Sequence, residues 1–201
     1  MDAEHLLHRA IAFAERAHRG QPRKGTPEPY FNHPVAVGMI VLAHGHGVEA
    51  AVVGLLHDVI EDTPADRDEI EEAFGRAIAQ AVVDLSEQDK TLSWEDRKTA
   101  YVEHLAGATE LALPACAADK IHNLRSILWD LDAARAEGTD PAAVWRRFKR
   151  PPRQISAYHR AVHRVLRGRG FSGSLLDSLD RAIERFADAV RVDPRDDRFR
   201  E

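Results

Sequence analysis

The sequence predicts an all-α fold. Alanine, leucine, arginine and glutamate dominate its 201 residues, and runs of β-branched residues are almost absent. Apolar residues recur at spacings of three and four along most of the chain, which is the period of an amphipathic helix. No segment forms a convincing strand.

The first predicted helix is capped by Asp2 and ends near residues 18–20. One apolar stripe runs along it, formed by Leu6, Leu7, Ala10, Phe13, Ala14 and Ala17. The following segment, 21–32, contains Gly25 and three prolines, so we expect a loop there.

A second helix is expected to begin near His33, with Asn32 as its cap. Pro34 then lies in the first turn, where its missing N–H is harmless. A third helix is predicted over 49–62. Its residues 50–56 are uniformly apolar, so most of its sides should be buried.

The remaining apolar periodicity predicts helices over 67–73, 76–86, 94–106, 111–136, 141–166 and 174–191. Prolines within 149–153 should break or kink the helix around them, because proline cannot donate to the helical hydrogen-bond ladder. We expect one domain over residues 1–192 and a charged, disordered tail over 193–201.

Composition excludes several classes of protein. Hydrophobic residues make up 44% and charged residues 30% of the chain, as in an ordinary globular domain. The sequence contains neither an eighteen-residue apolar stretch nor a recognisable secretory signal, so we expect a cytoplasmic protein with no membrane partner. The net charge of −5 argues against a nucleic-acid partner. The oligomeric state stays open, a homodimer included.

Cysteine usage restricts the kind of metal site that the chain could build. Cys116 is the only cysteine, so neither an internal disulfide nor a cluster of thiolates can form. Any metal must therefore be held by nitrogen and oxygen atoms.

The densest chemical signal is the segment His-Asp-Val-Ile-Glu-Asp at 57–62. In a continuous helix, His57 lies one turn from Glu61 and Asp58 one turn from Asp62. Three carboxylates within one turn repel one another, and near a helix C-terminus they also oppose the macrodipole. A bound divalent cation would reverse the sign of this energy. The alternative is a solvated acidic helix end beside a core histidine.

A metal site needs further ligands, and two other segments offer them. His33 lies at the start of a predicted helix, and Asp119 lies inside an apolar-periodic helix with Asn123 one turn later. A buried carboxylate without a partner is costly, so Asp119 needs a cation or a donor. Singly, each residue is more often a packing or capping residue than a ligand.

Together these residues resemble the HD-domain phosphohydrolases, whose ligands occur in the order H…HD…D and bind one divalent ion in an all-α core. The closer similarity is to the Rel/Spo-type alarmone hydrolase domain, over residues 5–166. It rests on the segments 12–14, 17–25, 29–34, 55–63, 74–75 and 118–125. Because we find no synthetase domain after them, the chain looks like the small stand-alone alarmone hydrolases.

The resemblance implies a compact HD-domain fold that removes the 3′-pyrophosphate of (p)ppGpp, typically with Mn²⁺, and releases pyrophosphate. It implies four metal ligands: His33, His57, Asp58 and Asp119. Glu61 and Asp62 would orient or deprotonate the attacking water, and Asn123 would support the site.

The resemblance also implies contacts to the substrate. Arg23 and Lys24, in the loop before the second helix, would meet its phosphates or base. Arg97, Lys98 and Tyr158 occupy positions where the family has further phosphate and ribose contacts.

One departure leaves the base of the substrate open. Guanosine-specific enzymes of this type usually have a Thr-Lys-Leu segment where this chain has residues 82–90, which end at Lys90. A (p)ppApp-like adenosine 3′-pyrophosphate is therefore an alternative. Two further hypotheses are an HD phosphohydrolase for another nucleotide, such as a 5′-nucleotidase, and a catalytically silent nucleotide-binding module.

Overall fold

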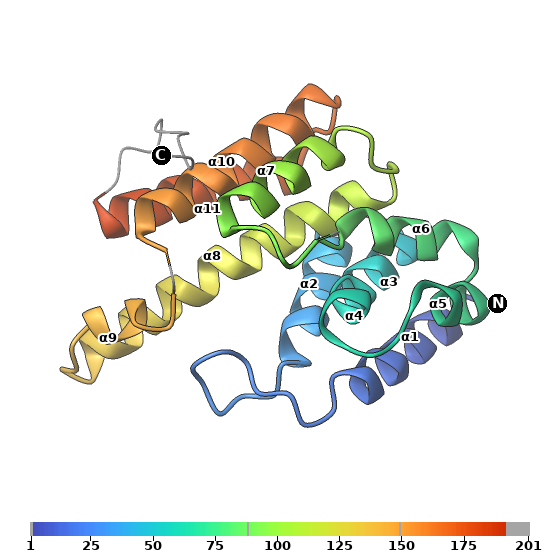
Figure 1. The fold of residues 1–201 in the computed structure, drawn as a ribbon, viewed down its shortest axis with the longest axis horizontal. Coiled ribbons are helices and arrows are strands. Elements are labelled where there is room, and N and C mark those ends of the chain that lie inside the picture. Colours follow the sequence, from blue (N-terminus) through green and yellow to red (C-terminus); the bar gives the residue numbers. More distant parts are fainter. Residues whose placement is uncertain (1, 88, 149, 192–201) are drawn as a thin grey trace. The chain divides into compact units, whose positions relative to one another are not determined.

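A computed structural model describes residues 2–87, 89–148 and 150–191, and Figure 1 shows its helices. Over these ranges every regular element is an α-helix, and the one β-type contact is an isolated bridge between Pro22 and Pro29. The all-α prediction is confirmed. The predicted tail, 193–201, lies outside the described residues.

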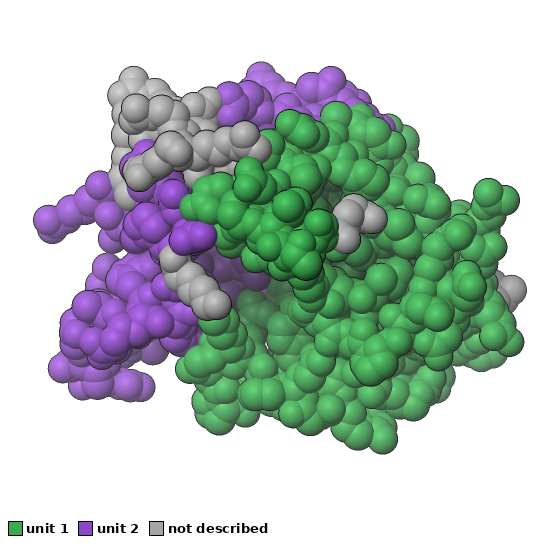
Figure 2. Space-filling view, viewed as in Figure 1, with its two compact units in different colours: residues 1–119 green, residues 120–201 purple. Residues whose placement is uncertain are grey.

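The chain divides into two compact units, residues 1–119 and 120–201 (Figure 2). The first unit contains α1 (Ala3–Ala17), α2 (Asn32–Ala43), α3 (Val48–Leu56), α4 (Val59–Asp62), α5 (Arg67–Phe74), α6 (Arg76–Leu85) and α7 (Trp94–Leu105). α8 (Ala112–Ala136) runs through the boundary between the units. The second unit continues with α9 (Ala142–Trp145), α10 (Pro152–Gly168) and α11 (Ser174–Val190).

Helix starts follow local hydrogen bonding. Asp2 caps α1 as predicted, accepting the N–H of His5 at 2.8 Å. The predicted cap by Asn32 is wrong, because α2 already begins at Asn32 and has no side-chain cap. The N–H groups of Asn32 and His33 instead donate to the carbonyls of Pro29 and Tyr30. Backbone carbonyls of the loop therefore satisfy the first N–H groups of α2 in place of a side-chain cap.

α3 is the central helix of the first unit. All of its residues from Ala50 to Leu56 are buried, as the uniformly apolar sequence predicts. It packs against α1, α2 and α6 (Figure 1). Where α2 crosses α3, glycines face each other: a Cβ on Gly54 would lie 3.3 Å from the backbone nitrogen of Gly38. This close approach places the start of α2 beside the end of α3.

The predicted continuous helix over 49–62 is wrong. α3 ends at Leu56, His57 and Asp58 form a turn, and α4 is a single further turn. In a regular helix neighbouring side chains point about 100° apart and cannot face each other. The turn brings the imidazole of His57 to 3.1 Å from the carboxylate of Asp58, so it lets adjacent residues meet at one point.

The second unit confirms the predicted break within 141–166. α9 ends at Trp145, and α10 begins at Pro152 with proline in its first turn. α10 and α11 pack together through strongly amphipathic faces. Among the described helices, none is both long enough and apolar enough to cross a membrane.

We expect Gly54→Ala to lower the free energy of unfolding by about 1–3 kcal/mol, because the added methyl meets the backbone of α2, which cannot rotate away. It should also move His33 away from His57. Urea denaturation measures the first effect. Gly168→Ala is the control, since its Cβ would have open space; equal stability of the two variants would contradict the close crossing.

Candidate metal centre

Four side chains of the first unit converge from α2, from the turn between α3 and α4, and from α8. His33 lies in the first turn of α2, His57 follows α3, Asp58 precedes α4, and Asp119 lies in α8. Nε2 of His33 is 3.6 Å from Oδ2 of Asp58 and 3.2 Å from Oδ1 of Asp119. The corresponding distances from Nε2 of His57 are 3.1 and 3.6 Å.

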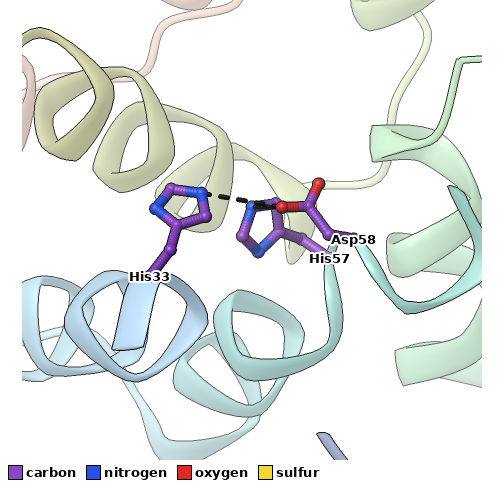
Figure 3. Close-up of side chains that lie close together, drawn as sticks. All are labelled: His33, His57 and Asp58. Atoms are coloured by element: carbon purple, nitrogen blue, oxygen red, sulfur yellow. Dashed lines mark ion pairs between the residues drawn. The ribbon is translucent and has the colours of Figure 1, made fainter. Parts of the chain in front are cut away.

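Figure 3 shows three of these residues, His33, His57 and Asp58, pointing toward one another. One potential ligand atom from each lies within 4.8 Å of those from the other two. The structure therefore brings together the four residues proposed as ligands from the sequence.

When His57 is neutral, its tautomer directs the lone pair of Nε2 to the place where these side chains meet. Nδ1 of His57 lies 2.7 Å from the carbonyl oxygen of Gly54, which can only accept, so Nδ1 carries the proton. Nε2 is buried and makes no hydrogen bond of good geometry to any described residue, although carboxylate oxygens are near. An unprotonated nitrogen facing carboxylates is repulsive, so the cluster needs a cation between them.

The pKa shifts within the cluster also indicate that it needs a cation. Burial lowers the pKa of His33 and keeps this imidazole neutral. Burial also opposes the charged form of His57, but Asp58 and Asp119 outweigh it and raise its pKa well above the ordinary value. The pKa of Asp58 is lowered, because the histidines outweigh its own desolvation. Without a metal, a proton on His57 supplies the cation.

A divalent ion would balance the cluster better than a proton. Two carboxylates carry two negative charges, and two neutral imidazoles add none, so one divalent cation gives a neutral site. Two nitrogen and two oxygen donors suit Mn²⁺, Fe²⁺ or Zn²⁺. These residues thus fit a single divalent metal.

The loop before α2 supports the cluster in ways that sequence reasoning missed. The hydroxyl of Tyr30 donates to Oδ2 of Asp58 at 2.5 Å. Gln21 donates to the backbone carbonyl of Asp62 at 2.7 Å, and its other amide atom contacts Nδ1 of His18 at 2.8 Å. The only available signal was that these residues lie within the segments that carry the family resemblance.

Glu61 and Asp62 flank this cluster. The side chain of Glu61 is half-buried, and its Oε2 accepts the backbone N–H of Glu87 at 3.2 Å. Burial, Glu87 and Asp58 together raise the pKa of Glu61. The ammonium group of Lys90 contacts the carbonyl of Glu61 and lies 3.1 Å from Oδ1 of Asp62. Glu61 is therefore a better proton acceptor than an exposed glutamate.

The predicted substrate contacts of the first unit lie on the loop before α2 and on α7. The guanidinium of Arg23 is 5.9 Å from the ring centre of Tyr30, and Lys24 is exposed on the same loop. Arg97 and Lys98 both pair with the carboxylate of Glu87. Their proposed contacts to phosphates stay predictions.

Asn123 and Tyr158 belong to the second unit. The backbone carbonyl of Asn123 accepts the hydroxyl of Ser126 at 3.0 Å. Tyr158 is buried in α10, with the ammonium group of Lys120 5.4 Å from its ring centre. Their assigned roles also stay predictions.

A model of the HD domain family matches residues 10–145, which include all four converging residues. The chain belongs to the HD domain family. The match runs across the boundary between the two units. HD-family membership implies a divalent metal ion, and the histidine and aspartate cluster provides suitable donors for it.

Among curated relatives of this HD domain, the guanosine-3′,5′-bis(diphosphate) 3′-pyrophosphohydrolase MESH1 of Homo sapiens is 39% identical over 153 residues. This match covers 74% of the chain and 81% of MESH1. The bifunctional (p)ppGpp synthase/hydrolase SpoT of Escherichia coli K12 is 38% identical over 127 residues, which cover 60% of the chain. The aligned region spans 18% of SpoT, so the chain matches only a small part of that protein.

Solved structures share this HD fold. A metazoan SpoT ortholog, described as hydrolysing ppGpp, matches with a TM-score of 0.70 and 28% identity, over 90% of this chain and 94% of the other. A Listeria monocytogenes protein matches with a TM-score of 0.65 and 30% identity, over 80% and 97% of the two chains.

The raised pKa of His57 predicts how the stability of the metal-free HD domain depends on pH. Protonated His57 stabilises the fold below its unfolded-state pKa of about 6.5, and this contribution is lost as the pH rises through the raised folded-state value. We expect the Tm of the EDTA-treated protein to fall over that range. Added Mn²⁺ should remove the fall, because the metal replaces the proton.

Thermal unfolding between neutral and alkaline pH, with and without Mn²⁺, measures this effect. His57→Gln should abolish the dependence, whereas the control His8→Gln, at an exposed position of α1, should retain it. A Tm that Mn²⁺ leaves unchanged throughout would contradict a metal site here.

We expect Tyr30→Phe to weaken Mn²⁺ binding by about 10- to 100-fold, as for other groups that orient a metal-binding carboxylate. Isothermal titration calorimetry with Mn²⁺ measures this. Tyr101→Phe removes a buried hydroxyl from α7 of the same unit and should leave the affinity unchanged. Equal affinities of the two variants would show that Tyr30 does not act on the site.

Proposed function

We propose that this HD domain hydrolyses the 3′-pyrophosphate of (p)ppGpp, or of a close purine analogue such as (p)ppApp, and releases pyrophosphate. The observation that carries the proposal is the convergence of His33, His57, Asp58 and Asp119 on one point. Its support from comparison is the 39% identity to MESH1 over most of both chains.

The four converging residues would hold the metal, for which Mn²⁺ is our proposal because it is typical of the family that the sequence resembles. When bound, a divalent ion lowers the pKa of water and neutralises charge on phosphoryl oxygens. The arrangement of two imidazoles and two carboxylates around one point supports this assignment.

Glu61 is our candidate for the proton acceptor, with Asp62 beside it to orient the water. In the proposed reaction, water attacks the phosphorus bonded to the 3′-oxygen and gives its proton to Glu61. The bond from that phosphorus to the 3′-oxygen breaks, pyrophosphate leaves, and the 3′-oxygen takes up a proton. The raised pKa of Glu61 supports its role, because a general base works best when its pKa is near the working pH.

Charge on the substrate would be met by basic residues. Arg23 and Lys24 are proposed to contact its phosphates or base. Arg97 and Lys98 are proposed for the phosphates, where two cations against the one carboxylate of Glu87 leave a positive charge in surplus.

The proposal also includes supporting roles for Asn123 beside the metal and Tyr158 at the ribose. The small-molecule nucleotide is the proposed partner, and the cytoplasm is the proposed compartment. We further propose that residues 1–192 act as one functional domain, since the family match extends over both units.

Incubation of the purified protein with Mn²⁺ and ppGpp, followed by separation of the products, tests the proposal. We expect GDP and pyrophosphate. Glu61→Gln should lower kcat by about 10²- to 10⁴-fold, the usual contribution of a general base, while Mn²⁺ binding is retained. Glu72→Gln, at an exposed position of α5, is the matched control.

Other outcomes would replace the proposal. Preferential turnover of ppApp in the same assay would change the base, and release of orthophosphate from a 5′-nucleotide would indicate a different phosphohydrolase. Binding of ppGpp without turnover would favour a silent nucleotide-binding module.

A further inference from the structure

Glu87 lies in the segment between α6 and α7 and has a buried carboxylate. Its side chain is 5% exposed. Removing a carboxylate from water is costly unless cations or donors compensate for it. Two cations from α7 do so: Nη1 of Arg97 donates to Oε2 at 2.8 Å, and the ammonium group of Lys98 donates to Oε1. Both oxygens of Glu87 are therefore held by neighbouring residues of one helix.

The backbone of the same residue reaches the acid pair. The N–H of Glu87 donates to Oε2 of Glu61 at 3.2 Å. The other oxygen of Glu61, Oε1, is 3.9 Å from the ammonium group of Lys90, a looser contact in which Lys90 is half exposed. Glu61 is thus contacted by two residues. Glu87 has a buried side chain, whereas that of Lys90 is half exposed, so the contact from Glu87 is the better fixed of the two.

This connection is not required by the fold of either helix. The C-terminal end of α6 is closed by Ser86, which donates to the carbonyls of Val82 and Val83. The N-terminal end of α7 is capped by Ser93. Arg97 and Lys98 could reach solvent, since about a quarter and a fifth of their side chains are exposed. Their pairing with a buried acid instead immobilises the peptide that contacts Glu61.

We infer that Glu87 is a positioning residue, which ties its own peptide N–H, and with it the carboxylate of Glu61, to the two cations of α7. This inference rests on the proposed function, in which Glu61 accepts the proton of the attacking water. A hydrogen bond to one carboxylate oxygen limits rotation of the group, so the other oxygen keeps one direction. The negative charge of Glu87 also raises the pKa of Glu61, which makes Glu61 a stronger proton acceptor.

Glu87→Gln tests the inference, because it keeps the size of the side chain and removes the charge that holds both cations. We expect kcat for ppGpp to fall about 10- to 100-fold, part of what a general base contributes, with KM changed less than about threefold. Glu103→Gln, exposed on α7, is the matched control and should behave as wild type. A higher KM with unchanged kcat would overturn the inference, since Glu87 would then serve only the two cations.

A double-mutant cycle separates positioning from a structural role. If Glu87 acts through Glu61, Glu87→Gln should lower kcat by less than about twofold in a Glu61→Gln background, because the base is already absent. A purely structural anchor would give the same loss of activity in both backgrounds, and that result would overturn the inference.

A measurement without turnover keeps the inference apart from the proposed function. Failure of the wild-type protein to release pyrophosphate from ppGpp would refute the function. Independently, amide hydrogen exchange at Glu87 and the ¹³C carboxyl resonance of Glu61 report their contact. Faster exchange and a shifted resonance in Glu87→Gln, with both unchanged in Glu103→Gln, support the inference. Wild-type values in Glu87→Gln would overturn it, whatever the substrate.

Discussion

The first unit depends on one electrostatic constraint, which is that two largely buried carboxylates face two buried imidazoles and need a cation to balance them. Asp58 and Asp119 are 18% and 9% exposed at their side chains, and His33 and His57 are almost fully buried. Hydrophobic packing could never favour such a cluster by itself, because every member loses hydration. A proton or a divalent ion at its centre makes the arrangement favourable.

The helices of this unit are arranged so that the cluster can form. His33 and His57 come from the start of one helix and the end of the next, and the glycine pair at the α2–α3 crossing lets these ends approach closely. The loop residue Tyr30 donates a hydrogen bond to the carboxylate of Asp58 and so restricts its orientation. Core packing, a close helix crossing and a hydrogen bond to the carboxylate thus act on the same few atoms.

Most of the helices and the four converging residues could be predicted from the sequence. Apolar periodicity is local, so it predicted α5 to α8 and α11 closely. The carboxylates of 57–62 stood out because packing gives no reason to gather them, and the family resemblance added His33 and Asp119 as ligands. Tertiary requirements were not predictable in this way. The break at His57 and the lack of a cap from Asn32 depend on partners elsewhere in the fold, and local propensity favoured a continuous helix.

Long-range polar contacts were also hidden in the sequence. Nothing in the segments around Glu87 or Lys90 indicates that both approach the acid pair of α4, because their partners are more than twenty residues away. The family resemblance implied that Arg97 and Lys98 contact phosphates or ribose, and it gave no sign that a single buried acid holds both. The identity of the metal and of the substrate's purine base depends on contacts to the bound metal and nucleotide, and apolar periodicity carries no information about them.

The turn at His57 and Asp58 limits how this protein could be made more robust. Asp58 has φ −97° and ψ −2°, in the sparsely populated bridge region where many active-site residues lie. Replacements that favour an uninterrupted helix here would improve local propensity while turning the carboxylate away from its imidazole neighbour. Selection for heat resistance alone would therefore reward sequences that lose the site, whereas selection for turnover would preserve this irregular turn.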